Sequence, residues 1–277
     1  MDLNNLSRFD LKDRVIVITG GSGLLGGMHA ESIAGAGGIP VLADLNGKSS
    51  EKAAASIAKK FRIPALGVKA DITDKTNVET LCDTVLTRFG RIDGLINNAA
   101  NNPKMEIQVD TEWSRFENFP VDAWEQDVSV GLKGAFLCSQ VLGSKMAERG
   151  KGVIVNISSD LGLIGPDQRL YEQDGIPDDQ QPVKPITYSV IKSGLIGLTR
   201  YLATYWATKG IRVNTLCPGG VETGQPKNFK ERLHSRIPMN RMANKDEYQG
   251  AVLFLVSDAS SYMTGATLTV DGGRTCW

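Results

Sequence analysis

The sequence predicts one α/β domain spanning residues 1–277, built on a doubly wound parallel sheet with helices on both faces. Short apolar runs alternate with longer helical patterns almost from the start of the chain. These runs are rich in Val, Ile and Leu on both faces, as expected of parallel strands that helices cover on both sides. A chain of 277 residues can also bury a full core. The βαβ alternation therefore predicts about seven strands joined by right-handed crossovers.

The expected elements follow one another as strands separated by helices, apart from two polar interruptions. We expect strands at residues 14–19, 40–44, 65–70, 92–97, 152–158, 211–216 and 266–270. Helical patterns fill residues 49–60, 75–89, 121–149 and 187–209. The polar stretches at about 101–120 and 160–185 follow the carboxyl ends of expected strands, where such sheets bind ligands. We therefore expect these inserted loops to border a site, and the alternative is a surface excursion without that role.

The composition argues against several classes of partner and site. The 31 basic and 31 acidic residues balance, so nothing favours nucleic acid or an anionic membrane surface as a partner. No apolar run is long enough to span a bilayer, and the polar amino terminus lacks the apolar stretch of a secretory signal. With two histidines, neither a metal site nor a Ser-His-Asp triad is expected. We expect a cytoplasmic protein whose cysteines are buried free thiols: Cys82, Cys138, Cys217 and Cys276.

A glycine-rich turn lies between the first expected strand and the first helix. It reads Thr-Gly-Gly-Ser-Gly-Leu-Leu-Gly over residues 19–26. Gly20 permits a tight turn, while Gly23 and Gly26 let the backbone approach a pyrophosphate at the helix N-terminus. A cofactor bound in this way would also contact Ser22 and Leu25. The turn therefore predicts a dinucleotide site, and a purely structural turn is the alternative.

Acidic residues end the second and third expected strands. Asp44 lies 18 residues after Gly26, where an acid would bind the hydroxyls of an adenosine ribose. Its carboxylate would repel a 2′-phosphate, so NAD is the expected cofactor and NADP is less favoured. Asp71 and Ile72 follow the third strand and are expected near the adenine edge. A surface acid is the alternative interpretation of Asp44.

A tyrosine and a lysine one helical turn apart provide acid–base chemistry. Tyr188 and Lys192 lie at positions i and i+4, so their side chains share one face of the expected helix. The Lys192 ammonium would lower the pKa of the Tyr188 phenol from its ordinary value of about 10 toward the working pH. A phenol tuned in this way can exchange a proton with a carbinol oxygen. With the glycine turn and the strand that ends in Ser158 and Ser159, this pair indicates a nicotinamide-dependent oxidoreductase.

In this combination and order, the motifs resemble those of the short-chain dehydrogenase/reductase family over nearly the whole chain. The resemblance rests on the glycine-rich turn, residues 97–100, the serine strand, the Tyr188–Lys192 pair, Asn214 with Pro218 and Gly219, and the ending at residues 265–273. It implies a Rossmann fold, NAD(P) chemistry on a small-molecule substrate, and a homodimer or homotetramer.

The resemblance also implies roles for matching positions. Tyr188 resembles the general acid/base, and Lys192 resembles the residue that lowers its pKa and holds the nicotinamide ribose. Ser159 resembles the serine that orients the substrate oxygen, because the family's serine begins a Ser-x-x-Gly step that starts here at Ser159 rather than Ser158. Further cofactor contacts are implied at Asn98, Ala99, Pro218, Gly219, Val221 and Thr223.

Three features depart from the family pattern. The glycine spacing resembles the extended branch, which includes sugar-nucleotide epimerases and dehydratases, whereas the ending Val-Asp-Gly-Gly favours the ordinary branch. Gly131 stands where the family has a catalytic asparagine that supports a water between lysine and solvent. A backbone-bound water or Ser129 would have to serve instead. Ser159 and Tyr188 lie 29 residues apart, so the insertion at about 160–185 would rim the site and suit a hydroxylated substrate. The alternative is a loop unrelated to substrate choice.

We therefore expect an NAD(H)-dependent oxidoreductase that interconverts a secondary alcohol and a ketone of a sugar, a polyol or a nonulosonic-acid-pathway substrate. One alternative is a sugar or sugar-nucleotide epimerase or dehydratase that retains its NAD. Another is a catalytically silent nucleotide-binding scaffold. The missing asparagine favours that scaffold, whereas the intact Ser159, Tyr188 and Lys192 argue against it.

Overall fold

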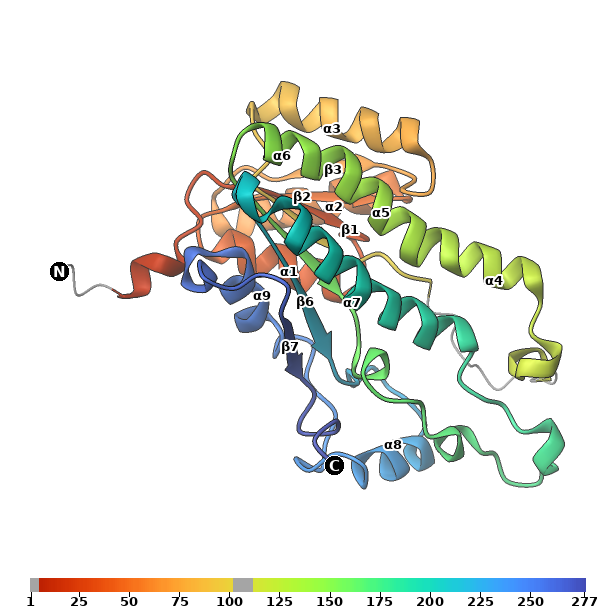
Figure 1. Cartoon of the computed structure of the whole chain (residues 1–277). Helices are drawn as coiled ribbons and strands as arrows, with labels where there is room; N and C mark the ends of the chain where they lie inside the picture. The colour runs from red at the N-terminus through yellow and green to blue at the C-terminus, as the bar shows by residue number, and fades with distance from the viewer. Residues whose placement is uncertain (1–4, 102–111) are drawn as a thin grey trace.

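The computed structural model describes residues 5–101 and 112–277, and its centre is a parallel sheet of seven strands (Figure 1). The order across the sheet is β3-β2-β1-β4-β5-β6-β7, so the chain reverses its direction of growth between β1 and β4. The strands are β1 (Val15–Thr19), β2 (Ile39–Asp44), β3 (Leu66–Lys69), β4 (Gly94–Asn97), β5 (Gly152–Ile157), β6 (Ile211–Pro218) and β7 (Thr267–Val270). The predicted doubly wound sheet is confirmed.

Helices cover both faces of this sheet. α1 packs against α2 and α9 on one face, whereas α3, the run from α4 to α6, and α7 lie on the other (Figure 1). The helices are α1 (Leu24–Gly35), α2 (Gly47–Phe61), α3 (Lys75–Phe89), α4 (Val121–Val128), α5 (Gly134–Cys138), α6 (Ser144–Glu148), α7 (Ile186–Trp206), α8 (Lys227–His234) and α9 (Gln249–Val256).

Strand side chains alternate between two buried cores, because successive residues of a strand point to opposite faces of a sheet. Val15 and Val17 of β1 belong to the core under α3 and α7. Ile16 and Ile18, between and beyond them, belong to the core under α1 and α9. All four are fully buried, which explains why the sequence shows continuous apolar runs instead of alternating polar residues.

A helical segment covers the expected residues 121–149, but it is not one continuous α-helix. α4, α5 and α6 are joined by π-helical turns at Ser129–Lys133 and Ser139–Gly143. Close tertiary contacts occur within the first of these turns and directly after it. A Cβ on Gly131 would lie 2.5 Å from Ile191 Cγ2, and one on Gly134 would lie 2.6 Å from Ile72 Cδ1. The apolar periodicity of the sequence carries no information about such contacts with distant segments, so the sequence predicted a uniform helix.

The inserted stretch at 160–185 is an ordered part of the fold. It contains three short 3₁₀ turns and no longer helix or strand. Leu170 is buried in a small cluster with Leu233 of α8, and Arg232 Nη1 donates to the carbonyl oxygen of Glu172 at 2.7 Å. On its other side, the backbone N–H of Val183 donates to Ser114 Oγ at 3.1 Å. The stretch therefore connects α8 with the segment before α4. Of the other stretch, at 101–120, residues 102–111 lie outside the described part of the chain.

The cysteine prediction is wrong at one position. Cys82, Cys138 and Cys217 are buried free thiols, but Cys276 is exposed because it lies past the end of β7, outside the sheet. In the described residues, no helix combines the length and the apolar character needed to cross a membrane.

Candidate active site

The residues predicted to form a site gather along the carboxyl edge of the sheet. Gly20, Asp44, Asn98 and Ser159 each lie at or just after the end of β1, β2, β4 and β5, and Pro218 ends β6. Because all paired strands are parallel, their carboxyl ends share one edge. The switch in strand order between β1 and β4 lies in the middle of these residues, at the place where such sheets bind ligands.

The glycine-rich turn is a tight backbone cradle at the start of α1. Gly20 adopts a positive φ of 62°, and the amide of Gly23 donates to its carbonyl oxygen at 3.1 Å. A Cβ on Gly26 would lie 2.2 Å from that same oxygen, so only glycine fits there. Gly23 caps α1 without a side-chain hydrogen bond, and Leu25 lies in the first turn of the helix. The cradle leaves the N-terminal amides of α1 facing the carboxyl edge, which suits a pyrophosphate.

Asp44 and Ser22 form one unit beside this turn. Asp44 Oδ2 accepts hydrogen bonds from the Ser22 hydroxyl at 2.6 Å and from the Ser22 amide at 3.1 Å. Asp44 also lines a surface hollow together with Lys48 and Lys69. The hollow therefore presents a carboxylate that suits ribose hydroxyls and two lysines that suit a phosphate. Nearby, Asp71 Oδ1 accepts from the Thr73 amide and hydroxyl, at 2.9 and 2.7 Å.

The end of β4 is fixed to the end of β1 by hydrogen bonds. The Asn98 side chain donates to the carbonyl oxygens of Thr19 and Gly20, at 3.0 and 3.2 Å. The amides of Asn98 and Ala99 both donate to Thr19 Oγ1, at 3.0 and 3.1 Å. The Asn98 side chain therefore helps to hold the backbone of the glycine-rich turn in place. Sequence reasoning missed Thr19 in this role, although it is the first residue of the glycine motif.

The loops after β6 and β7 border the other half of this edge. The Gly219 amide donates to the Val270 carbonyl oxygen at 2.9 Å, and Tyr248 Oη donates to the Gly219 carbonyl oxygen at 2.9 Å. Val221 forms an isolated parallel bridge with Ala243. Pro218 and Gly219 are thus held rigidly. Thr223 is exposed farther along the loop.

Tyr188 and Lys192 share the first turns of α7, but their electrostatics differ from the expectation. Lys192 is 5 % exposed, and its Nζ donates to the Ile157 carbonyl oxygen at 2.9 Å. Burial lowers the pKa of Lys192 to about 8. Burial also raises the pKa of the Tyr188 phenol, and a hydrogen bond with the Ser159 side chain opposes that shift. The prediction that the pKa of Tyr188 is lowered is therefore wrong for the side chains of the protein by themselves. The loss of water around the phenol affects this pKa more than the neighbouring charges do.

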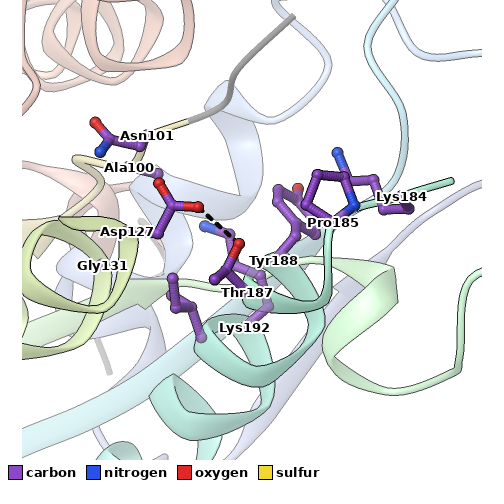
Figure 2. Close-up of a pocket in the computed structure, with 10 residues that line it drawn as sticks. Ala100, Asn101, Asp127, Gly131, Lys184, Pro185, Thr187, Tyr188 and Lys192 are labelled. Carbon is purple, nitrogen blue, oxygen red and sulfur yellow. Dashed lines mark hydrogen bonds between the residues drawn. The ribbon is translucent and has the colours of Figure 1, made fainter. Parts of the chain in front are cut away.

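A second lysine lies over the tyrosine ring and was missed by sequence reasoning. Lys184 Nζ lies 4.0 Å from the ring centroid of Tyr188, whereas Lys192 Nζ lies 5.7 Å from it (Figure 2). Burial lowers the pKa of Lys184 to about 8, and the carboxylates of Asp160 and Asp127 oppose this shift. Lys184 precedes the N-cap Pro185 of α7, so helical spacing gave no sequence signal for its place over the ring.

The two serines after β5 have different partners. The Ser158 hydroxyl donates to the Lys192 carbonyl oxygen at 2.6 Å, so it is used in joining β5 to α7. The Ser159 hydroxyl instead interacts with Tyr188 and donates to Asp160 Oδ1 at 2.7 Å. This arrangement favours Ser159 over Ser158 as the serine beside the reacting oxygen.

A small cavity lies where the family's asparagine would be expected. Gly131, Asp127, Thr187, Tyr188 and Lys192 are among its lining residues (Figure 2). Thr187 Oγ1 donates to Asp127 Oδ2 at 2.6 Å across this cavity, between α7 and α4. Asp127 lies one helical turn before Gly131 and was also missed, although its spacing of four residues places it on the same helix face.

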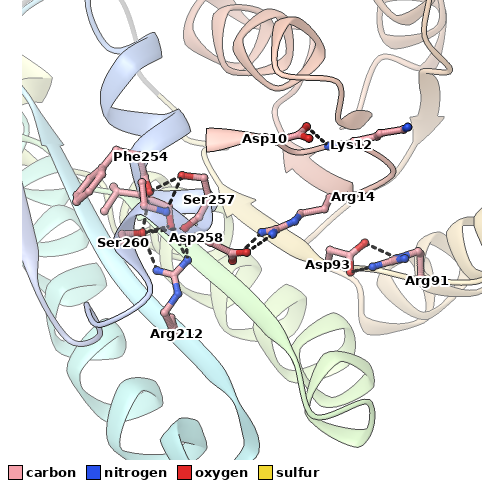
Figure 3. Close-up of polar contacts among 12 residues, drawn as sticks. Asp10, Lys12, Arg14, Arg91, Asp93, Arg212, Phe254, Ser257, Asp258 and Ser260 are labelled. Carbon is pink, nitrogen blue, oxygen red and sulfur yellow. Dashed lines mark hydrogen bonds and ion pairs between the residues drawn. The ribbon is translucent and has the colours of Figure 1, made fainter. Parts of the chain in front are cut away.

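A group of ion pairs at the opposite, amino edge of the sheet, of which the Asp93 carboxylate is buried, does not belong to this site (Figure 3). Asp93 accepts from Arg91 Nε at 2.7 Å and from Arg149 Nη2 at 2.5 Å. Burial would raise the pKa of Asp93, but the hydrogen bonds from these groups hold it below its ordinary value. Arg14 pairs with Asp258 beside them. In residues 5–101 and 112–277, no group of three His, Cys, Asp or Glu side chains is placed to hold a metal ion.

Comparisons with known proteins agree with this geometry. The family model described as short chain dehydrogenase matches residues 14–171, and the model described as enoyl-(acyl carrier protein) reductase matches residues 178–275. Cis-4-hydroxycyclohexanecarboxylate dehydrogenase of Sinomonas cyclohexanicum is 33 % identical over 268 residues, covering 95 % of this chain and 97 % of that protein.

Two solved structures show the same architecture. A gluconate 5-dehydrogenase from Burkholderia cenocepacia, in complex with NADP and tartrate, matches with a TM-score of 0.86 and 29 % identity over 98 % of this chain and 99 % of that one. An NAD⁺-bound xylitol dehydrogenase matches with a TM-score of 0.82 and 28 % identity over 95 % and 99 %. Proteins similar to this chain therefore include users of both cofactors.

Proposed function

Because this chain belongs to the short-chain dehydrogenase/reductase family, we propose that it is an NAD(H)-dependent oxidoreductase that interconverts a secondary alcohol and a ketone. The observation that carries the proposal is the meeting of Ser159, Tyr188 and Lys192 at the sheet edge that also holds the glycine cradle. A bound nicotinamide supplies the hydride donor or acceptor. The chain itself binds, orients and moves the proton.

Tyr188 is the proposed acid/base at the substrate oxygen. In reduction its phenol gives a proton to that oxygen, and in oxidation its phenolate takes one. Ser159 contacts the same oxygen. Hydrogen-bond donors that are fixed at this oxygen stabilise the charge that develops on it during hydride transfer. Lys192 has three donors, of which one bonds to the Ile157 carbonyl oxygen, and it holds the nicotinamide ribose in this proposal.

NAD is the proposed cofactor, because the Asp44 carboxylate would repel a 2′-phosphate. Its two bonds from Ser22 hold this carboxylate beside the cradle. The cradle itself fits a dinucleotide, because a Cβ on Gly26 would fill the space between helix and turn. The adenine-side residues in this proposal are Asp71 and Ile72.

A sugar or polyol is the proposed substrate class. The insertion at 160–185 borders the site with polar residues, and the similar proteins include dehydrogenases named for xylitol and gluconate.

A homodimer or homotetramer is proposed because Tyr201 and Tyr205 of α7 are 64 % and 62 % exposed and stack on each other. Light scattering of the purified protein tests this assembly. A cytoplasmic location is proposed from the three buried free thiols.

A substrate screen tests the activity. Xylitol, gluconate and cis-4-hydroxycyclohexanecarboxylate are supplied with NAD⁺ or NADP⁺, and net formation of NADH or NADPH is recorded. Net cofactor reduction distinguishes a dehydrogenase from an epimerase or dehydratase that regenerates its NAD. Tyr188→Phe should lower kcat by about 10²–10⁴-fold while NADH binding is kept. Full activity in that variant refutes the proposed mechanism, and a wild-type protein that binds neither cofactor supports a silent scaffold.

A further inference from the structure

A second tyrosine, Tyr171, lies in the middle of the inserted stretch and is fixed against α8. It ends a short 3₁₀ turn of the insertion. Arg232 Nη1 of α8 donates to the carbonyl oxygens of Arg169 and Glu172, at 3.2 and 2.7 Å, on either side of this tyrosine. The Tyr171 ring packs against the Phe229 ring of α8, with 5.6 Å between the ring centroids. The backbone and the ring of Tyr171 are therefore both held in place.

The hydroxyl of Tyr171 lies toward the reacting groups. Burial raises its pKa, and the ionisable groups that also act on this hydroxyl are Arg274, Tyr188 and Asp160. Arg274 and Asp160 form a buried ion pair directly after Ser159, in which Arg274 Nη1 donates to Asp160 Oδ2 at 2.7 Å. The same pair acts on the Tyr188 phenol. Because Coulomb interactions weaken with distance, the Tyr171 hydroxyl lies at the same end of the site as Tyr188 and Ser159.

This hydroxyl differs from two other phenols of the region in its hydrogen bonding. Tyr188 hydrogen-bonds with the Ser159 side chain, and Tyr248 Oη donates to the Gly219 carbonyl oxygen at 2.9 Å. Within the described part of the chain, no residue hydrogen-bonds with the Tyr171 hydroxyl. Tyrosine hydroxyls that are removed from bulk water usually have a partner. A neutral phenol both donates and accepts, so this one suits a hydroxyl group of a bound molecule.

A free phenol in this place bears on the choice of substrate. In the proposed function, Tyr188 and Ser159 bind the oxygen that reacts. A substrate with one hydroxyl uses these two groups and leaves Tyr171 without a partner, whereas a second hydroxyl can bind to it. A site that hydrogen-bonds a substrate hydroxyl discriminates against an analogue that lacks it, because a polar group of the site is then left unpaired.

We propose that Tyr171 is a specificity-determining residue, whose phenol binds a second hydroxyl of the substrate while Tyr188 and Ser159 bind the reacting one. This inference rests on the proposed dehydrogenase function and gives the inserted stretch a role in selecting substrates with two or more hydroxyls. Tyr171 takes no part in proton transfer. Its removal therefore weakens diols and polyols and leaves simple alcohols unaffected.

Tyr171→Phe tests the inference, because it removes one oxygen and keeps the ring that packs against Phe229. The probes are cyclohexanol and its cis-1,2-, cis-1,3- and cis-1,4-diols, in which the ring sets the distance between the two hydroxyls. Ligand-observed NMR on the enzyme–NADH complex gives the dissociation constant of each probe. That complex cannot oxidise an alcohol, so the probes stay intact. Cyclohexanol is the internal reference, because it has no second hydroxyl.

The wild-type protein should bind at least one diol more tightly than cyclohexanol. Tyr171→Phe should reduce that preference by about three- to tenfold, while the dissociation constant of cyclohexanol stays the same. The inference is overturned if wild type prefers no diol, or if the variant keeps the preference in full. An equal weakening of cyclohexanol and the diols also overturns it, because such a result indicates a change in the shape of the site.

A matched control and a turnover assay complete the test. Tyr262→Phe removes the same oxygen from a fully exposed side chain and should leave the diol preference unchanged. With NAD⁺, the ratio of kcat/KM for the preferred diol to that for cyclohexanol should fall in Tyr171→Phe as the binding preference does. If wild type oxidises secondary alcohols and the variant keeps the diol preference, only the role of Tyr171 fails. If wild type oxidises no alcohol of the substrate screen with either cofactor, the proposed function fails and this inference falls with it.

Discussion

An asparagine at position 131 should destabilise this protein, although the family has one there. A Cβ at this position would lie 2.5 Å from Ile191 Cγ2 and 3.1 Å from Ile191 Cδ1. The first of these atoms is attached directly to the Cβ of a β-branched residue, whose χ1 angle is stiff in a helix. Ile191 cannot swing its Cγ2 away cheaply, so the backbones of α7 and the π turn at Ser129–Lys133 would have to separate.

The loss in the free energy of unfolding caused by Gly131→Asn follows from this geometry. Overpacking of a well-packed core costs about 1–3 kcal/mol, and asparagine regains only about 0.3 kcal/mol of helix propensity relative to glycine. Gly131→Asn should therefore lower the free energy of unfolding by about 1–3 kcal/mol. For a chain of this size that corresponds to a fall in Tm of roughly 2–12 °C.

Two substitutions of the contacted residue make the experiment specific. Ile191→Val retains Cγ2, so Gly131→Asn should lower Tm by its full amount in that background. Ile191→Ala removes Cγ2, so the same substitution should lower Tm much less there. Thermal unfolding by circular dichroism of wild type, the three single variants and the two double variants measures both effects. The steric reasoning is refuted if Gly131→Asn is as stable as wild type, or if its effect is equal in the valine and alanine backgrounds.

Two other predictions concern stability and cofactor choice. Asp93→Asn should cost about 1–3 kcal/mol at neutral pH, because the neutral amide keeps one acceptor oxygen and cannot satisfy the Val15 amide, Arg91 and Arg149 together. The folded-state pKa of Asp93 is lowered, so its contribution is present above the unfolded value of about 3.9 and is lost as the pH falls through the lower folded value. In urea unfolding, a difference between wild type and variant that persists unchanged below that pH contradicts this assignment. Asp44→Ala should reduce the preference for NADH over NADPH by at least about tenfold, because the carboxylate that opposes the 2′-phosphate is removed while Lys48 and Lys69 remain. Fluorescence titration with both cofactors measures this, Glu51→Gln in the same hollow is the matched control, and an unchanged preference would show that Asp44 is not the selector.

The order of strands and helices could be read from the sequence because it depends on local patterns. Val15 to Ile18 are apolar at every position, and that run is enough to predict a strand buried on both faces. The glycines at 20, 23 and 26 mark a turn by spacing alone. Strands that are parallel then bring Gly20, Asp44, Asn98 and Ser159 to one edge, so the location of the site also followed from the chain.

The partners within that site depend on contacts between distant segments, and local patterns carry no record of them. Arg274 reaches Asp160 across 114 positions of sequence, and Thr187 reaches Asp127 across 60. The raised pKa of Tyr188 has the same origin, because it reflects how completely the folded chain removes water from the phenol. The sequence therefore predicted the serine, the tyrosine and the lysine as site residues. Packing sets the partners of that serine and the space at Gly131, because both arise only when α7, the π turn and the carboxyl-terminal segment come together.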